Sequence, residues 1–96
     1  MSEESLKSVE SFESPELRDR IAAILQLLLR EMSHCDGIIN VKYIVGEHTT
    51  VYSIEMPVGS KARVIGQGGR NINAIRSLVS AMGGANGIRA IVDLVI

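Results

Sequence analysis

The sequence predicts an α+β fold whose elements follow the order α-β-β-α-α-β. Three observations support this prediction. Apolar residues recur at steps of three and four over residues 15–32, which is the period of an amphipathic helix. Two segments rich in β-branched residues follow, at 38–45 and 50–56, and a short turn separates them. A glycine-rich loop then joins two helical segments, and an apolar strand closes the chain.

The composition is that of one small globular domain. The chain has 96 residues, of which 46% are hydrophobic and 22% are charged, and a domain of this size buries roughly 60–70% of its unfolded surface. A single cysteine excludes an internal disulfide bond. The longest apolar stretch, residues 21–29, is far shorter than the ~20 residues of a membrane span. Glutamates occupy the N-terminal region, where a secretory signal carries basic residues, so we expect a cytoplasmic protein that contacts no membrane.

The N-terminal region divides into an acidic tail and the start of a helix. Residues 1–13 are rich in serine and glutamate, and we interpret them as a mobile tail that precedes a single domain at residues 14–96. Ser14 is a residue type that caps helices, and Pro15 suits the first helical position. Glu16 suits the positive end of the helix dipole.

The helix predicted at residues 15–32 carries a wide apolar stripe. Its regular apolar positions are Leu17, Ile21, Ile24, Leu25, Leu28 and Met32. Leu27 and Leu29 widen the stripe to roughly 200°, well beyond the ~100° of a helix that faces a core on one side. Either the helix is deeply buried in its own domain, or the additional leucines face a partner.

Turn residues and apolar alternation define the remaining elements. Residues 57–60 are expected to form a loop, and residues 61–65 a single helical turn. A helix follows at 70–82, and the strand at 88–96 is apolar almost throughout, as a central strand would be. The inward face of the second strand is predicted to carry Tyr52, Ile54 and Met56. The buried face of the helix at 70–82 is predicted to carry Ile72, Ile75, Val79 and Met82.

Positive charge is concentrated in the second half of the chain. Residues 1–20 hold six acidic and three basic side chains, a net charge of −3. Residues 60–89 hold five basic side chains and no acidic one. The five are Lys61, Arg63, Arg70, Arg76 and Arg89. A basic segment in a near-neutral chain is either a solvated surface or a binding surface for an anion.

The loop at residues 66–69 has the properties of a phosphate-binding turn. Gly66 and Gly69 lack a Cβ atom, so the chain can turn tightly and a ligand can approach the backbone. The helix that follows begins near Arg70 with unpaired N–H groups and the positive end of its dipole. Ile65 and Ile72 are placed to floor a groove for bases beside this phosphate site. The simpler alternative is a glycine-rich turn that binds nothing, because a G-x-x-G pattern arises easily by chance.

Two other phosphate-binding patterns do not fit. The Walker pattern G-x-x-x-x-G-K-[ST] is absent from the sequence. The dinucleotide pattern G-x-G-x-x-G fails because Asn71 stands where the last glycine is required.

The segment Val64-Ile65-Gly66-x-x-Gly69-x-x-Ile72 resembles the signature of KH domains. With two strands before this signature and one after it, the chain is similar to the type II KH arrangement. That arrangement implies a three-stranded mixed sheet with helices packed on one face. The match covers residues 15–96, and with no other domain present the chain resembles the KhpA-type small KH proteins. This resemblance implies a bacterial, cytoplasmic RNA chaperone that binds about four nucleotides of single-stranded RNA.

The resemblance also implies protein partners, and it implies RNA contacts at the loop 66–69, at the flanking helix ends and at Ile65 and Ile72. The basic and polar residues near the loop extend this set because of their positions in the sequence. RNA contacts are expected from Lys61, Arg63, Ile65, Gly66, Gln67, Gly68, Gly69, Arg70, Ile72, Asn73 and Arg76. Loops of this family usually carry lysine or arginine at a middle position, whereas Gln67 and Gly68 are both uncharged. The alternative function is therefore a protein-interaction subunit that forms a homodimer or pairs with a larger multidomain KH-containing protein.

Other functional classes find little support in the sequence. His34, Cys35 and Asp36 are adjacent, and adjacent ligands rarely converge on one metal ion. The only aromatic residues are Phe12, Tyr43 and Tyr52, too few for a sheet surface that stacks bases. No nucleophile–base set or carboxylate pair stands out, so we expect neither an enzyme nor a cofactor.

Overall fold

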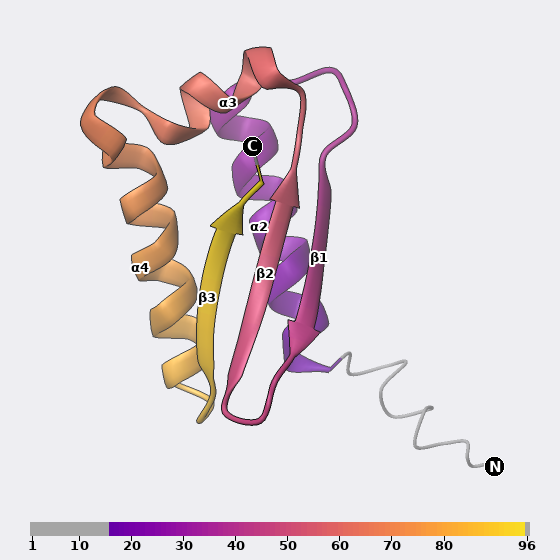
Figure 1. Cartoon of the computed structure of the whole chain (residues 1–96), viewed down its shortest axis with the longest axis vertical. Helices are drawn as coiled ribbons and strands as arrows, with labels where there is room; N and C mark the ends of the chain where they lie inside the picture. Colours follow the sequence, from indigo (N-terminus) through magenta and orange to yellow (C-terminus); the bar gives the residue numbers. More distant parts are fainter. Residues whose placement is uncertain (1–15, 96) are drawn as a thin grey trace, which may run out of the picture.

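A computed structural model describes residues 16–95 of the chain (Figure 1). The predicted acidic tail at 1–13 and the predicted helix-starting residues Ser14 and Pro15 lie outside the described residues. The elements are α2 (Leu17–Ser33), β1 (Asn40–Val45), β2 (Thr49–Glu55), α3 (Val58–Ile65), the 3-10 turn η1 (Gln67–Gly69), α4 (Arg70–Gly84) and β3 (Arg89–Leu94). This order confirms the predicted α-β-β-α-α-β arrangement.

The sheet has β2 at its centre. β1 pairs with β2 in an antiparallel register, and β3 pairs with the other side of β2 in a parallel register. The three helices of residues 16–95 lie against one face of this mixed sheet, as predicted (Figure 1). The expectation of a central closing strand was wrong, because β3 is an edge strand. Its side chains alternate, with Ala90 and Val92 buried and Ile91 39% exposed.

The core lies between the inward face of the sheet and the three helices. Tyr52 and Ile54 have no exposed surface and Met56 is 8% exposed, which confirms the predicted inward face of β2. Ile72, Ile75 and Val79 of α4 are also buried, and Met82 packs beside them. Each fully buried aliphatic or aromatic side chain stabilises the fold by about 1.5–3 kcal/mol. The core therefore joins the helix layer to all three strands.

The wide apolar stripe of α2 divides between core and surface. Leu29 is fully buried and belongs to the core, together with Ile21 and Leu25. Leu27 is 68% exposed and Ile24 is 40% exposed. The two interpretations of the stripe thus apply to different residues. Leu29 serves the domain itself, and Leu27 is available to a partner.

α3 is longer than the single turn expected from the sequence. It begins at Val58, and the N–H of Ser60 donates to the carbonyl of Pro57 at 2.9 Å. Residues 58–60 are therefore helical, and the loop predicted there was wrong. Val58 is 80% exposed and Gly59 is a weak helix former, so neither residue indicates a helix by its own pattern.

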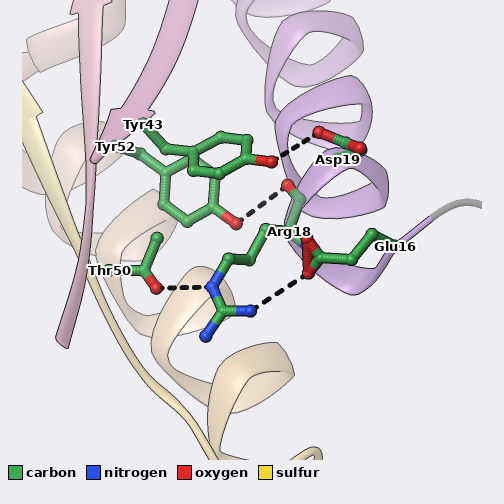
Figure 2. A network of polar contacts seen from close by, with 6 residues as sticks. All are labelled: Glu16, Arg18, Asp19, Tyr43, Thr50 and Tyr52. Carbon is green, nitrogen blue, oxygen red and sulfur yellow. Dashed lines mark hydrogen bonds and ion pairs between the residues drawn. The ribbon is translucent and has the colours of Figure 1, made fainter. Parts of the chain in front are cut away.

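Polar contacts attach the first turn of α2 to the sheet (Figure 2). The Tyr52 hydroxyl donates to the Arg18 carbonyl at 2.9 Å, and the Tyr43 hydroxyl donates to Oδ1 of Asp19 at 2.7 Å. Nε of Arg18 donates to Oγ1 of Thr50 at 2.9 Å. Glu16 caps the helix by accepting from the N–H of Arg18 at 3.1 Å, and it also pairs with the Arg18 guanidinium. These bonds satisfy polar groups of a buried strand and define where α2 begins.

The free energy of unfolding should fall as the pH rises above 10. The hydrogen bond to Asp19, followed by partial burial, raises the pKa of Tyr43 from 10.0 to about 12. A raised tyrosine pKa stabilises the fold fully below the unfolded value, and this stabilisation is lost as the pH rises from 10 towards 12. Burial raises the pKa of Tyr52 in the same direction. Guanidinium denaturation at about pH 8 and about pH 11 measures the change.

Tyr43→Phe isolates the contribution of the Tyr43 hydroxyl. The variant should lose about 1 kcal/mol at neutral pH, because one hydrogen bond is removed. Its stability should fall less steeply than that of the parent chain above pH 10, while Tyr52 retains its own pH dependence. The same fall of the free energy of unfolding with pH in both proteins would contradict a hydroxyl proton held between Tyr43 and Asp19.

Candidate nucleic-acid interface

The glycine loop joins α3 to α4 at one corner of the molecule (Figure 1). Gly66, Gly68 and Gly69 have φ angles of 75°, 66° and 77°, in the left-handed region that favours glycine. The N–H of Gly69 donates to the carbonyl of Gly66 at 3.1 Å and closes the turn. Three of the four loop positions therefore need glycine for their backbone conformation. The sequence pattern predicted this need for Gly66 and Gly69 but not for Gly68.

Asn71 holds the two ends of the loop together. Its Nδ2 donates to the carbonyl of Arg63 in the last turn of α3 at 2.9 Å. A Cβ atom on Gly66 would lie 2.7 Å from Cγ of Asn71, so the asparagine occupies the space that the glycine leaves. A structural role for Asn71 was not predicted from the sequence. The available signal was an asparagine in the first turn of a helix, where its amide often bonds to a nearby backbone.

The basic side chains near the loop have different surroundings. Arg70 is exposed at the first position of α4, and Lys61 is half-buried on α3. Nη1 of Arg63 donates to the carbonyl of Ser33 at the end of α2, at 3.1 Å. Part of the donor capacity of Arg63 therefore serves the packing of α2 against α3. Of the three predicted cations beside the loop, Arg70 is the most open to a ligand.

The apolar floor expected beside the loop is smaller in the structure. Ile65 is 38% exposed at the end of α3. Ile72 is 5% exposed and belongs to the hydrophobic core, so it leaves little surface for a ligand. Ile75 is buried as well. The helical period of α4 places position 72 in the core, and this burial explains the isoleucine there without a role in binding.

A groove of about 250 Å³ lies between α4 and the edge strand β3. Its lining residues are Arg76, Ser80, Arg89, Ala90, Ile91 and Val92. Arg76 and Arg89 stand on its two walls, and Nε of Arg76 donates to the carbonyl of Val92 at 3.5 Å. Asn73, Arg76 and Ser80 share one side of α4, because they follow each other at steps of three and four. This side of the helix leads from the glycine loop to the groove.

The geometry brings Arg89 into the candidate site and reduces the role of Ile72. From the sequence, Arg89 could either contact RNA or lie on a solvated surface, because nothing local to it indicates that β3 lies beside α4. Gly66, Gln67, Gly68, Gly69, Arg70, Asn73 and Arg76 lie on the loop and on α4, where they were expected. Within residues 16–95, no three His, Cys, Asp or Glu side chains gather to hold a metal ion. No helix in that range is long and apolar enough to cross a membrane.

The family model described as KhpA/KhpB, KH domain, matches residues 19–94 of the chain. The chain belongs to this family of KH domains. The matched region runs from α2 to β3, so it includes the glycine loop and both walls of the groove. The resemblance seen in residues 64–72 is thereby confirmed.

A comparison with curated proteins gives one relative to describe. The RNA-binding protein KhpA of Chlamydia pneumoniae is 29% identical over 56 residues, which are 58% of this chain and 72% of that protein. No solved structure matches the chain.

Substitutions in the glycine loop of this KH domain should destabilise it in a graded way. Gly68→Ala meets no atom within 4 Å but keeps a positive φ, and it should cost about 1–2 kcal/mol. Gly66→Ala adds a collision with Asn71, and it should cost about 2–4 kcal/mol. Denaturant unfolding of each variant measures these losses.

Gly59→Ala is the matched control for this series. Gly59 lies in the first turn of α3, where an added Cβ meets nothing within 4 Å and no positive φ is required. The control should be neutral or stabilising by up to about 1 kcal/mol, because alanine is the better helix former. Equal losses for Gly66→Ala and Gly68→Ala would show that Asn71 does not fill the space beside Gly66.

Proposed function

We propose that this KH domain is a cytoplasmic, non-enzymatic RNA-binding protein. The loop at 66–69 holds the backbone of a short single-stranded RNA, and the groove between α4 and β3 accepts its bases. The main support for this proposal is that the loop and the groove lie along one side of α4, which runs from Gly69 through Asn73 and Arg76. A strand of about four nucleotides suits a KH site of this kind. The printed name of the Chlamydia relative, an RNA-binding protein, agrees with the proposal.

The backbone at the start of α4 supports a phosphate contact. Gly69 is the N-cap of this 15-residue helix, and no side chain caps it there. The first turn of α4 contains no acidic residue. Its N–H groups and the positive end of the helix dipole are therefore suited to an anion. A Cβ atom added at Gly68 would meet no heavy atom within 4 Å, so a ligand can approach the loop closely.

Cations along the path supply charge that the loop itself lacks. Arg70 stands at the start of α4, and Arg76 and Arg89 line the groove farther along. Gln67 and Gly68 are uncharged, so few phosphates are neutralised at the loop. We therefore expect modest affinity that falls with salt, with a logarithmic slope of about 0.7 per neutralised phosphate. Ile65 adds partly exposed apolar surface for bases beside the loop.

Placing two carboxylates in the loop should abolish RNA binding and leave the fold intact. In Gln67→Asp/Gly68→Asp, the added charges repel phosphate at the start of α4. Aspartate is among the residues that best tolerate the positive φ of position 68. Fluorescence anisotropy of a labelled, unstructured RNA of random sequence, at two salt concentrations, measures the loss.

The matched control is Ala23→Asp/His48→Asp. Both residues are exposed, Ala23 in the first half of α2 and His48 in the turn between β1 and β2. The start of α2 and this turn lie at the end of the molecule away from the glycine loop (Figure 1). The control adds the same number of carboxylates, so it should weaken binding only slightly through the overall charge. Equal binding by the two double variants would remove the loop from the proposed site.

A second proposed role, compatible with the first, is association with another protein. The exposed Leu27 and Ile24 on α2, with Leu78 50% exposed on α4, favour it. These side chains lie in the helix layer, on the surface that the sheet does not cover. A homodimer, or a pair with a larger KH-containing protein, would bring weak RNA grooves together and strengthen binding through avidity.

Leu27→Glu tests the association through α2. Light scattering should show a dimer for the parent chain and a monomer for the variant, because a charge at this position opposes burial. Leu29→Glu is unsuitable, since Leu29 is fully buried and a charge there would unfold the domain. Val58→Glu, at another highly exposed apolar residue, is the matched control. A parent chain that is monomeric at all concentrations would refute the homodimer.

A further inference from the structure

The face of the sheet opposite the helices carries a row of apolar side chains. Ile44, Val51 and Ile91 are cross-strand neighbours on β1, β2 and β3. Ile44 is 71% exposed and Ile91 is 39% exposed. The helices of the described structure all lie on the other face (Figure 1), so none of them covers this row.

Polar rows border the apolar row on both sides. One neighbouring row consists of Lys42, Ser53 and Asp93, and the other ends in Thr49 and Arg89. Lys42 pairs loosely with Glu55 at 4.0 Å and keeps 70% of its side chain exposed. Strands lie about 4.8 Å apart, so the apolar row is a stripe roughly 10 Å long. A stripe of this size suits a short segment of chain better than a large protein surface.

The chain enters the described structure close to this stripe. Asp19 accepts from Tyr43, and Arg18 donates to Thr50, both within the first turn of α2 (Figure 2). Tyr43 immediately precedes Ile44, and Thr50 immediately precedes Val51. The start of α2 therefore lies behind the stripe, on the helix side of the sheet. Only the edge strand β1 separates that point from the open face.

The sequence before Glu16 has the composition of an occupant for this face. Leu6, Val9 and Phe12 recur at intervals of three in an otherwise polar segment. Residues 1–15 hold four glutamates and one lysine, a net charge of −3. Phe12 is four residues from Glu16, and four extended residues span roughly 13 Å. This length is more than the ~4.8 Å that separates neighbouring strands, so it is enough to pass the edge strand β1.

We propose that residues 6–12 dock on the open face of the sheet, with Phe12 against Ile44 and Val51. Docking removes the apolar surface of Phe12 and of the stripe from water. Glu10 and Glu13 then lie near the basic residues at the border of the stripe, Lys42 and Arg89. Because the segment is tethered beside its site, its effective concentration there is in the millimolar range or above. The short connection from Phe12 to Glu16, and the start of α2 beside the stripe, favour this segment over a second copy of the chain.

Phe12→Trp in the full chain provides the probe. The parent sequence contains no tryptophan, so the substituted residue is the only indole emitter. Docking predicts a blue-shifted emission and reduced quenching by acrylamide, with the same values at every protein concentration. The measurement is made without nucleic acid, so its result does not depend on the proposed RNA binding.

Two further substitutions in the Phe12→Trp background locate the contact. Ile44→Lys and Ile91→Lys should each restore the emission and quenching of a solvated indole. Val58→Lys, at an even more exposed apolar residue on α3, should leave both unchanged. Circular dichroism confirms that each variant is folded, as the exposure of these positions leads us to expect.

Three results would overturn the proposal. A solvated indole in the Phe12→Trp chain would show that the segment does not dock. A blue shift that grows with protein concentration would assign the contact to a second copy. A concentration-independent shift that survives both Ile44→Lys and Ile91→Lys would place the segment on another surface.

Discussion

Burial of the inward face of β2 is the constraint on which the rest of this molecule depends. Tyr52 and Ile54 have no exposed surface, and β2 is also the strand that pairs with both neighbours. A buried tyrosine hydroxyl needs a partner, and the carbonyl of Arg18 supplies it. The polar requirement of one buried strand thus fixes the start of α2. From that start, Ile21, Leu25 and Leu29 follow the helical period into the core.

The glycine loop follows from the way the strands are joined. β2 and β3 are parallel, so the chain must cross over the sheet between them, and α3, η1 and α4 form that connection. The crossover must turn sharply where α3 ends and α4 begins, and three left-handed glycines make the turn. Asn71 then closes it by filling the space beside Gly66. Because α4 returns alongside β3, the same connection creates the groove. Loop and groove are therefore two consequences of one topological requirement.

Local patterns predicted the element order, the inward face of β2 and the buried face of α4, because periods of two and 3.6 residues report which side chains face inward. They failed where tertiary neighbours decide. The apolar composition of β3 suggested a central strand, but Ile91 faces outward on an edge. Leu27 and Leu29 are both leucines on one helix, and only the position of the sheet tells the buried one from the exposed one. Arg89 reaches the groove through a strand pairing that its own neighbours in sequence do not indicate.

The distribution of positive charge connects stability with the proposed binding. Arg63 is the one arginine of α3 and lies in its last turn beside the loop, yet it donates to Ser33 and secures the end of α2. The middle of the loop is uncharged, so attraction for phosphate has to come from the backbone of α4, from Arg70 and from the two arginines of the groove. Each such exposed contact contributes little alone and weakens with salt. The affinity of the proposed site therefore depends on how many of these contacts one RNA strand makes at once. Continuity from the loop to the groove therefore matters more than the charge of any one residue.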